Sequence, residues 1–267
     1  VGAVILIVVV AVAAIAIIAS NRPAARTGPP TSLGWAPTVA PDVLRAEAEP
    51  LHDYLGDTLS RDVTLVMTED YGELADKLVE GKIDYAVLPP LLYVRTRERE
   101  PEIVPLALKE FDGAMKSDGL LLVAMSLEVG TIADLKGKRF CLTDKNSTTG
   151  NFLPRAYIRR HGHEPEEFMG EVIWSGDHIQ VMRDLIAGKC EVGATYSGAF
   201  ISADKLGIPI GQIRTFAITG NVPQDVICAG PHVPKEARDA MQEALIAFDP
   251  ERDLQMDRLG ETQRITG

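Results

Sequence analysis

The chain has 267 residues, with 27 Lys and Arg against 38 Asp and Glu, which gives a formal net charge of −11. Such an acidic chain lacks the basic surface that binds nucleic acids, so we expect no nucleic-acid partner. Its five His and three Cys show no metal-ligand spacing, and no glycine-rich nucleotide-binding motif follows a strand-like run. We therefore expect neither a metal nor another cofactor.

The first 20 residues carry no charge, and 18 of them are hydrophobic. As a helix, residues 1–19 would be about 28 Å long, close to the thickness of the hydrocarbon core of a bilayer. The alternative is a cleavable signal peptide, but its apolar run is usually shorter, about 7 to 15 residues. Residues 1–20 are therefore predicted to form an uncleaved transmembrane helix.

Residues 21–31 contain three Pro, one Gly and no large apolar side chain. This composition is typical of an extended tether. The folded domain is predicted to begin at Ser32.

From residue 32 onward, short apolar runs alternate with segments of helical periodicity, a pattern that favours an α/β fold built on parallel strands. The first series is predicted to contain strands at 32–36, 63–67 and 85–88 and helices at 41–59 and 71–80. The second is predicted to contain strands at 120–125, 139–143, 172–174 and 192–195 and helices at 151–161 and 178–187.

The repeated pattern predicts two lobes with a ligand cleft between them. Strands at 213–217 and 226–229 are expected to return the chain to the first lobe. Lobe 1 is therefore predicted to comprise residues 32–118 and 214–267, and lobe 2 residues 119–213. Hinges are expected near residues 116–120 and 210–214.

Cys141, Cys190 and Cys228 each lie in an apolar, strand-like run. Three cysteines are too few for a disulfide framework, and their odd number leaves at least one free thiol. We expect all three to be buried small hydrophobic side chains.

A hydroxyl-rich loop, Ser147-Thr148-Thr149-Gly150, follows a predicted strand and precedes a predicted helix. A helix N-terminus offers unpaired N–H groups and partial positive charge, the hydroxyls add donors, and glycine permits close approach. The loop is predicted to bind a tetrahedral oxyanion. The alternative is an ordinary helix cap, for which one hydroxyl suffices.

Several short motifs occur in the same order as in a known family, over about 200 residues. They are Gly34-Trp35-Ala36-Pro37-Thr38, Asp70-Tyr71, Gly81-Lys82-Ile83-Asp84-Tyr85-Ala86, Asp134-Leu135-Lys136-Gly137-Lys138, the Ser147–Gly150 loop, Ser175-Gly176-Asp177-His178 and Gly188-Lys189-Cys190-Glu191-Val192-Gly193-Ala194. In this order they resemble the phosphate, phosphite and phosphonate periplasmic binding proteins of ABC transporters.

The resemblance implies a two-lobed α/β fold of the type II periplasmic-binding-protein (Venus-flytrap) class, here with an N-terminal transmembrane helix. It also implies ligand contacts at Tyr71, Tyr93, Ser147, Thr148, Gly150 and His178. Thr149 of the same hydroxyl-rich loop and Tyr196 complete the expected ligand-binding residues. The family's aminoalkylphosphonate binders hold the ligand's amine with carboxylates, yet residues 195–199 contain no acid. A small ligand without a cationic tail is therefore expected, although Asp225 offers one carboxylate.

These observations predict a membrane-anchored, extracytoplasmic (periplasmic) solute-binding receptor for a small phosphorus oxyanion, and not an enzyme. Arg22 and Arg26 after the apolar run would favour the opposite orientation, but the family captures solutes outside the cytoplasm. The expected partner is an ABC permease or a cytoplasmic segment upstream of Val1 that receives a signal. Two alternatives stay open: an enzyme on the same fold that uses Cys141 or His178 with a cofactor in the cleft, and a ligand-free interaction domain.

Overall fold

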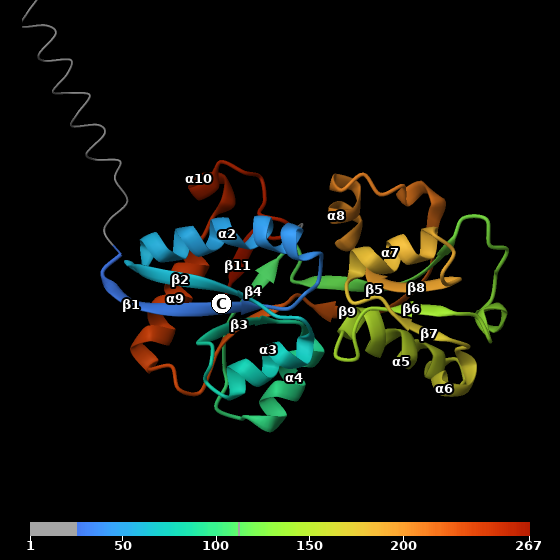
Figure 1. Cartoon of the computed structure of the whole chain (residues 1–267), viewed down its shortest axis with the longest axis horizontal. Helices are drawn as coiled ribbons and strands as arrows, with labels where there is room; N and C mark the ends of the chain where they lie inside the picture. The colour runs from blue at the N-terminus through green and yellow to red at the C-terminus, as the bar shows by residue number, and fades with distance from the viewer. Residues whose placement is uncertain (1–25, 112) are drawn as a thin grey trace, which may run out of the picture.

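The computed structural model describes residues 26–111 and 113–267, which fold into two α/β lobes, each built on its own sheet (Figure 1). The predicted two-lobed α/β architecture is confirmed. The predicted transmembrane helix and residues 21–25 of the predicted tether lie outside the described residues. Within the part that is described, no helix combines the length and apolarity needed to cross a bilayer.

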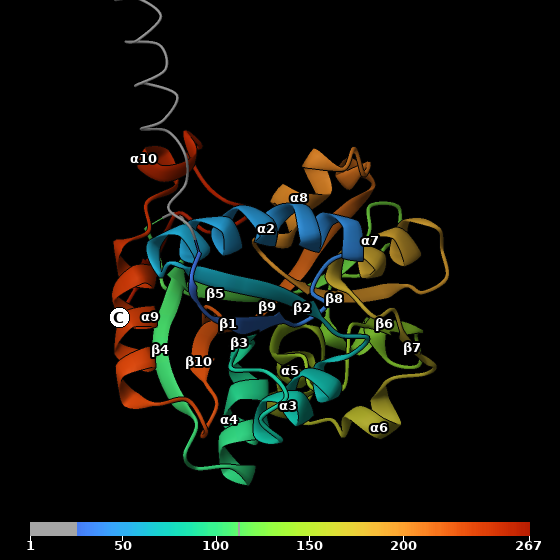
Figure 2. The same ribbon diagram turned by 60° about the vertical axis from the view of Figure 1, so that its left-hand side comes forward.

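Lobe 1 contains a six-stranded sheet in the order β11-β4-β10-β3-β1-β2. Its strands are β1 (Gly28–Trp35), β2 (Arg61–Met67), β3 (Tyr85–Leu88), β4 (Val104–Glu110), β10 (Val226–Ala229) and β11 (Arg264–Thr266). Its helices are α2 (Pro41–Thr58), α3 (Tyr71–Val79), α4 (Pro90–Arg99), α9 (Lys235–Ala247) and α10 (Pro250–Leu254). The helix α2 covers one face of the sheet, and α3 and α4 lie on the opposite face (Figure 2).

Lobe 2 contains a five-stranded sheet in the order β7-β6-β8-β5-β9. Its strands are β5 (Lys116–Ala124), β6 (Phe140–Leu142), β7 (Val172–Trp174), β8 (Val192–Tyr196) and β9 (Ile213–Pro223). Its α-helices are α5 (Leu153–Arg160), α6 (Pro165–Phe168), α7 (His178–Ile186) and α8 (Ala199–Lys205). Short helical turns occupy Ile132–Leu135, Thr148–Phe152 and Ile210–Gln212. The pairs α7 with α8 and α5 with α6 lie on opposite faces of this sheet (Figure 1).

The cores explain why these segments fold as they do. All four residues of β3 are buried, as expected for a central strand that has helices on both faces. On α2, Leu44, Ala48, Leu51 and Leu55 recur at intervals of three or four residues and are all buried, so they form one apolar face toward the sheet.

The first strand begins earlier than the sequence predicts. Residues 28–31, assigned to the tether, belong to β1, where Gly28 pairs with Arg61 and Thr31 with Val63. The register shifts between Gly28 and Thr31, and such an irregularity accommodates the two intervening prolines, which cannot donate to a regular ladder. The polar, proline-rich composition therefore concealed a strand end.

The strand pairing also differs from the predicted lobe boundary. The whole of β9, Ile213–Pro223, pairs antiparallel with β5 and so belongs to the sheet of lobe 2. The return to lobe 1 occurs between β9 and β10, and the outward crossing occurs between β4 and β5. The predicted crossing near residues 210–214 lay too early because an apolar run does not reveal which strand it will pair with.

Two of the three cysteines form a disulfide. Cys141 on β6 is bonded to Cys190, which precedes β8, and their Cα atoms are 5.8 Å apart. The expected burial is confirmed for all three, and Cys228 is a free thiol. The pairing of Cys141 with Cys190 follows from the fold: β6 and β8 are parallel neighbours, so strand pairing brings the two sulfurs together.

Candidate functional site

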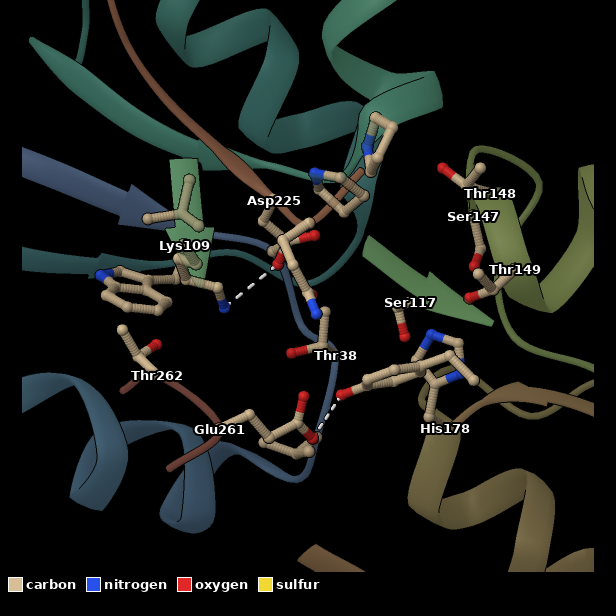
Figure 3. A pocket seen from close by; sticks show the side chains of 18 of the residues that line it. Thr38, Lys109, Ser117, Ser147, Thr148, Thr149, His178, Asp225, Glu261 and Thr262 are labelled. Atoms are coloured by element: carbon tan, nitrogen blue, oxygen red, sulfur yellow. Dashed lines mark hydrogen bonds and ion pairs between the residues drawn. The ribbon is translucent and has the colours of Figure 1, made fainter. Parts of the chain in front are cut away.

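A cavity of about 70 Å³ lies between the lobes and is lined by side chains of both (Figure 3). The lobes meet directly around it. The backbone N–H of His178 donates to the Thr38 carbonyl at 3.1 Å, and the backbone N–H of Leu91 donates to Thr148 Oγ1 at 2.9 Å. The chain therefore has its two lobes closed around the cavity.

The hydroxyl-rich loop forms one end of the cavity. Ser147, Thr148 and Thr149 line it, and their side chains are almost fully buried. Residues 148–152 form a single π-helical turn, a rare geometry that occurs frequently at functional sites. The Ser147 hydroxyl caps this turn by accepting from the Gly150 N–H at 3.0 Å. Ser147 can therefore serve both as a cap and as a ligand contact, because one hydroxyl can accept from the N–H of the turn and donate its own proton into the cavity.

Gly150 is buried but does not line the cavity. A Cβ at this position would lie 1.7 Å from Thr143 Oγ1 and 2.8 Å from Ser147 Oγ. Its role is therefore to let the turn pack against the end of β6 and so to place the Ser147 hydroxyl.

We expect Gly150→Ala to lower the free energy of unfolding by about 1 to 3 kcal/mol, the usual cost of overpacking, and to weaken ligand binding as Ser147 is displaced. Chemical denaturation and calorimetry measure the two effects. Gly130→Ala is the control, because a Cβ there meets no atom within 4 Å. Parent-like stability of Gly150→Ala would show that the close packing does not matter.

Tyr71, the first residue of α3, projects into the cavity from lobe 1. The residue is 1% exposed, and its hydroxyl forms no hydrogen bond of normal geometry with a described residue. Burial raises the pKa of Tyr71 well above its usual value, although the Ser147 side chain lies close enough to lower this pKa slightly, so the phenol keeps its proton. A buried donor without a hydrogen bond costs about 1 to 3 kcal/mol, so this hydroxyl is free to donate to a molecule that enters the cavity.

His178 is the first residue of α7 and lies in the cavity wall with only 3% of its surface exposed. Its Nδ1 is 3.1 Å from Thr195 Oγ1, and its ring packs edge-on against Tyr196 with centroids 4.7 Å apart. Burial lowers the pKa of His178 to about 3. The imidazole is therefore neutral at physiological pH, with Nε2 available to the cavity.

This lowered pKa has a defined effect on stability. The unfolded chain protonates this histidine near pH 6.5, whereas the folded chain resists until about pH 3, so acidification favours unfolding within that window. Relative to a His178→Gln variant, the free energy of unfolding of the parent should fall by about 2 kcal/mol between pH 6 and 4.5. Denaturation series at several pH values measure this. His161→Gln, at an exposed position, is the control, and a constant difference between parent and His178→Gln would contradict the prediction.

The opposite end of the cavity carries charge. The Lys109 ammonium is 3.3 Å from Asp225 Oδ2 and lies over the Trp35 ring, 5.6 Å from its centroid. Glu47 and Glu261 line the same cavity. The cavity therefore has a hydroxyl end and a charged end, visible on the two sides of Figure 3.

Tyr196 joins the two ends. Its ring contacts His178, and its hydroxyl donates to Glu261 Oε1 at 2.6 Å. Burial raises the pKa of Glu261 to about 7, although the hydrogen bond from Tyr196 and the charge of Lys109 act to lower it. Tyr196 thus lines the cavity as predicted, but its hydroxyl connects the lobes rather than pointing freely toward a ligand.

Tyr93 lies outside the cavity. It sits on α4, half-buried, and its hydroxyl accepts from Arg97 Nη1 at 3.1 Å. We therefore omit Tyr93 from the ligand contacts. Six of the eight predicted residues line the cavity together, namely Tyr71, Ser147, Thr148, Thr149, His178 and Tyr196.

The prediction missed several residues of the cavity, chiefly at the charged end. They are Trp35, Thr38, Glu47, Lys109, Ser117, Glu261 and Thr262. Trp35 and Thr38 belong to a motif that was noticed, but Lys109 lies on a strand that was not predicted and Glu261 in a C-terminal segment without periodicity. Trp35 is also fixed from behind, because its Nε1–H donates to His52 Nε2 at 2.9 Å.

Comparison with known proteins adds independent information. A family model described as "ABC transporter, phosphonate, periplasmic substrate-binding protein" matches residues 33–266. The "Phosphate-import protein PhnD" of Mycolicibacterium smegmatis is 24% identical over 211 residues, which cover 74% of this chain and 65% of that protein. The "Probable ABC transporter phosphite binding protein PhnD1" of Prochlorococcus marinus is 28% identical over 108 residues, 38% of this chain and 36% of that protein. The chain thus spans two thirds or less of these relatives' lengths.

Solved structures show the same fold. The PhnD1 protein of Prochlorococcus marinus in complex with methylphosphonate superposes with a TM-score of 0.80 at 18% identity, over 88% of this chain and 91% of that one. A binding protein component of an ABC phosphonate transporter from Pseudomonas aeruginosa also gives 0.80, at 15% identity over 89% and 81% of the two chains.

Proposed function

Because the chain belongs to the family of periplasmic substrate-binding proteins of phosphonate ABC transporters, we propose that it captures one small phosphorus oxyanion between its lobes and delivers it to an ABC permease. The ligand is phosphate, phosphite or a short alkylphosphonate. Membrane anchoring through residues 1–20 is part of the proposal and is supported by their composition alone.

The observation that carries the proposal is the buried Tyr71 hydroxyl, which forms no hydrogen bond of normal geometry among the described residues and shares the cavity with Ser147, Thr148 and Thr149. Four hydroxyl donors from two lobes match the several acceptor oxygens of a tetrahedral anion. The cavity of about 70 Å³ is far smaller than a typical drug-sized site of about 300 to 1,000 Å³. It suits one small anion.

Each donor has a defined task. Thr148 Oγ1 accepts from the Leu91 N–H of lobe 1, which leaves its own proton for the ligand. Neutral His178 donates one N–H from Nε2 if the Thr195 hydroxyl donates to Nδ1. Tyr71 approaches from lobe 1, so one anion bridges the lobes and favours their closure.

The cavity supports binding rather than catalysis. Cys141, the thiol considered as a nucleophile, is bonded to Cys190 and therefore has no free sulfur for attack. The lowered pKa of His178, about 3, is far from the range of an efficient general base at neutral pH. We propose that the ligand leaves unchanged.

The disulfide supports an extracytoplasmic location, because such bonds persist in oxidising compartments and are rare in the cytosol. Protease added to spheroplasts is expected to digest the domain while the membrane stays intact. Protection from the protease would contradict this placement.

Calorimetry on the full chain tests the binding proposal. We expect saturable 1:1 binding of at least one among phosphate, phosphite and methylphosphonate, and mass spectrometry should recover that ligand intact. Acetate is the control, because a planar anion with two oxygens cannot engage all the donors. The absence of binding by all three phosphorus oxyanions would refute the proposal, and chemical conversion of any of them would support the alternative of an enzyme.

A further inference from the structure

The charged end of the cavity surrounds an ammonium group that belongs to the protein itself. Lys109 Nζ lies over the Trp35 ring at 5.6 Å from its centroid and 3.3 Å from Asp225 Oδ2. The carboxylates of Glu47 and Glu261 line the same cavity. In Figure 3 the Lys109 side chain extends toward Asp225, with Glu261 across the cavity.

An aromatic face with several carboxylates is the chemistry that recognises an organic ammonium ion. Burial acts to lower the pKa of Lys109, but the charges of Asp225, Glu261 and Glu47 outweigh it and raise the pKa above the usual value. Trp35, Asp225, Glu261 and Glu47 together form a cage for an ammonium group, and the charged Lys109 side chain already occupies it. A second ammonium ion brought in by a ligand would meet repulsion instead of free carboxylates.

We propose that Lys109 is a specificity-determining residue: its ammonium fills a cage that would otherwise hold the amine of an aminoalkylphosphonate, so the cavity selects oxyanions without a cationic tail. This inference rests on the proposed function for the oxyanion at the hydroxyl end.

The similar lengths of the Lys109 side chain and an aminoalkyl tail make the proposal testable. Replacing Lys109 with Ala removes three carbons and one nitrogen, the atoms of a propylamine tail. The freed space and the unpaired carboxylates should then accept 2-aminoethylphosphonate or 3-aminopropylphosphonate, with the phosphonate at Ser147–Thr149 and the amine at Asp225 and Glu261. Lys109→Met fills most of the volume without a charge and should give no such gain.

Calorimetry at pH 8, above the pKa of Glu261, gives the comparison. The parent should bind methylphosphonate at least 10-fold more tightly than either aminoalkylphosphonate. Lys109→Ala should gain at least 10-fold in affinity for one of the aminoalkylphosphonates and much less for propylphosphonate, which has the tail without its charge. Equal gains for propylphosphonate and 3-aminopropylphosphonate would assign the effect to volume alone and overturn the proposal.

Removing one member of a buried ion pair is strongly destabilising, so Lys109→Ala can lose affinity simply because it unfolds. A second variant and a measurement of thermal stability therefore test folding separately. Lys109→Ala combined with Glu47→Gln leaves one fewer unpaired carboxylate and should show the same gain. Ethylammonium chloride should raise the melting temperature of Lys109→Ala but not that of the parent, with sodium chloride as the control.

The experiment with ethylammonium does not require a phosphorus ligand. It therefore tests the role of Lys109 separately from the proposed binding of an oxyanion. If the parent binds none of the tested oxyanions, the proposed function is refuted. If neither Lys109→Ala nor Lys109→Ala combined with Glu47→Gln responds to ethylammonium, the role of Lys109 is refuted. Failure of both variants to fold even with ethylammonium present would also refute it, since an external amine should replace the missing one.

Discussion

Replacing Ser147 and Thr148 together with Ala should weaken the binding of phosphate, phosphite and methylphosphonate by two orders of magnitude or more. Both hydroxyls line the cavity and are almost fully buried. Each hydrogen bond to a charged ligand contributes about 1.5 to 3 kcal/mol, and about 1.4 kcal/mol corresponds to a factor of ten. Because the chain carries a net charge of −11, its long-range field repels anions, and affinity must come from such local donors. Calorimetry measures the loss.

The double variant also loses structural contacts, and the control must match them. Ser147 caps the π-helical turn and Thr148 accepts from Leu91 of the other lobe, so some stability, about 1 kcal/mol for the cap, is lost as well. Thr131→Ala removes a capping hydroxyl from an exposed turn of the same lobe and should leave affinity unchanged. Parent-like affinity of the double variant would reduce both hydroxyls to caps.

His52, although distant from the cavity motifs in sequence, cannot serve as this control. Its Nε2 accepts from Trp35 Nε1–H at 2.9 Å and its Nδ1 is 3.0 Å from the Val63 carbonyl oxygen. Trp35 lines the cavity. A substitution of His52 would therefore release a cavity wall, which the sequence separation of the two residues does not reveal.

Most of the fold could be predicted because the alternation of apolar strands and amphipathic helices is a local signal. Strand β3 and helix α2 illustrate this, since burial on both faces or on one face imposes a different period on each. Pairing is not a local property. The strand β9 joins β5, about one hundred residues earlier, and nothing within its own eleven residues distinguishes that sheet from the other.

The candidate site divides in the same way. The hydroxyl end lies mainly in one loop, Ser147–Gly150, whose hydroxyl groups predict an anion site from the sequence alone. The resemblance to the phosphonate-binding family, now confirmed by the match over residues 33–266, added Tyr71 and His178. The charged end is assembled from Glu47, Lys109 and Glu261, which lie on three separate segments. Isolated acids and lysines are usually solvated surface residues, so only the folded arrangement reveals these three as a cluster.

Reduction of the Cys141–Cys190 disulfide should lower the free energy of unfolding by about 4 kcal/mol, because the bond closes a loop of 49 residues whose ends regain freedom in the reduced unfolded chain. The folded state should survive reduction, since β6 and β8 remain paired and the two sulfurs stay buried. Urea denaturation with and without dithiothreitol measures the difference as a shift in midpoint.

Two variants separate the disulfide from the thiols themselves. Cys141→Ala combined with Cys190→Ala should abolish the response to dithiothreitol, whereas Cys228→Ala, which removes the buried free thiol, should keep it in full. If the parent and the Cys141→Ala/Cys190→Ala variant responded alike, the reductant would be acting elsewhere. An unchanged midpoint in the reduced parent would mean that the 49-residue loop is already constrained in the unfolded chain, and the disulfide would then serve to hold lobe 2 together only after folding.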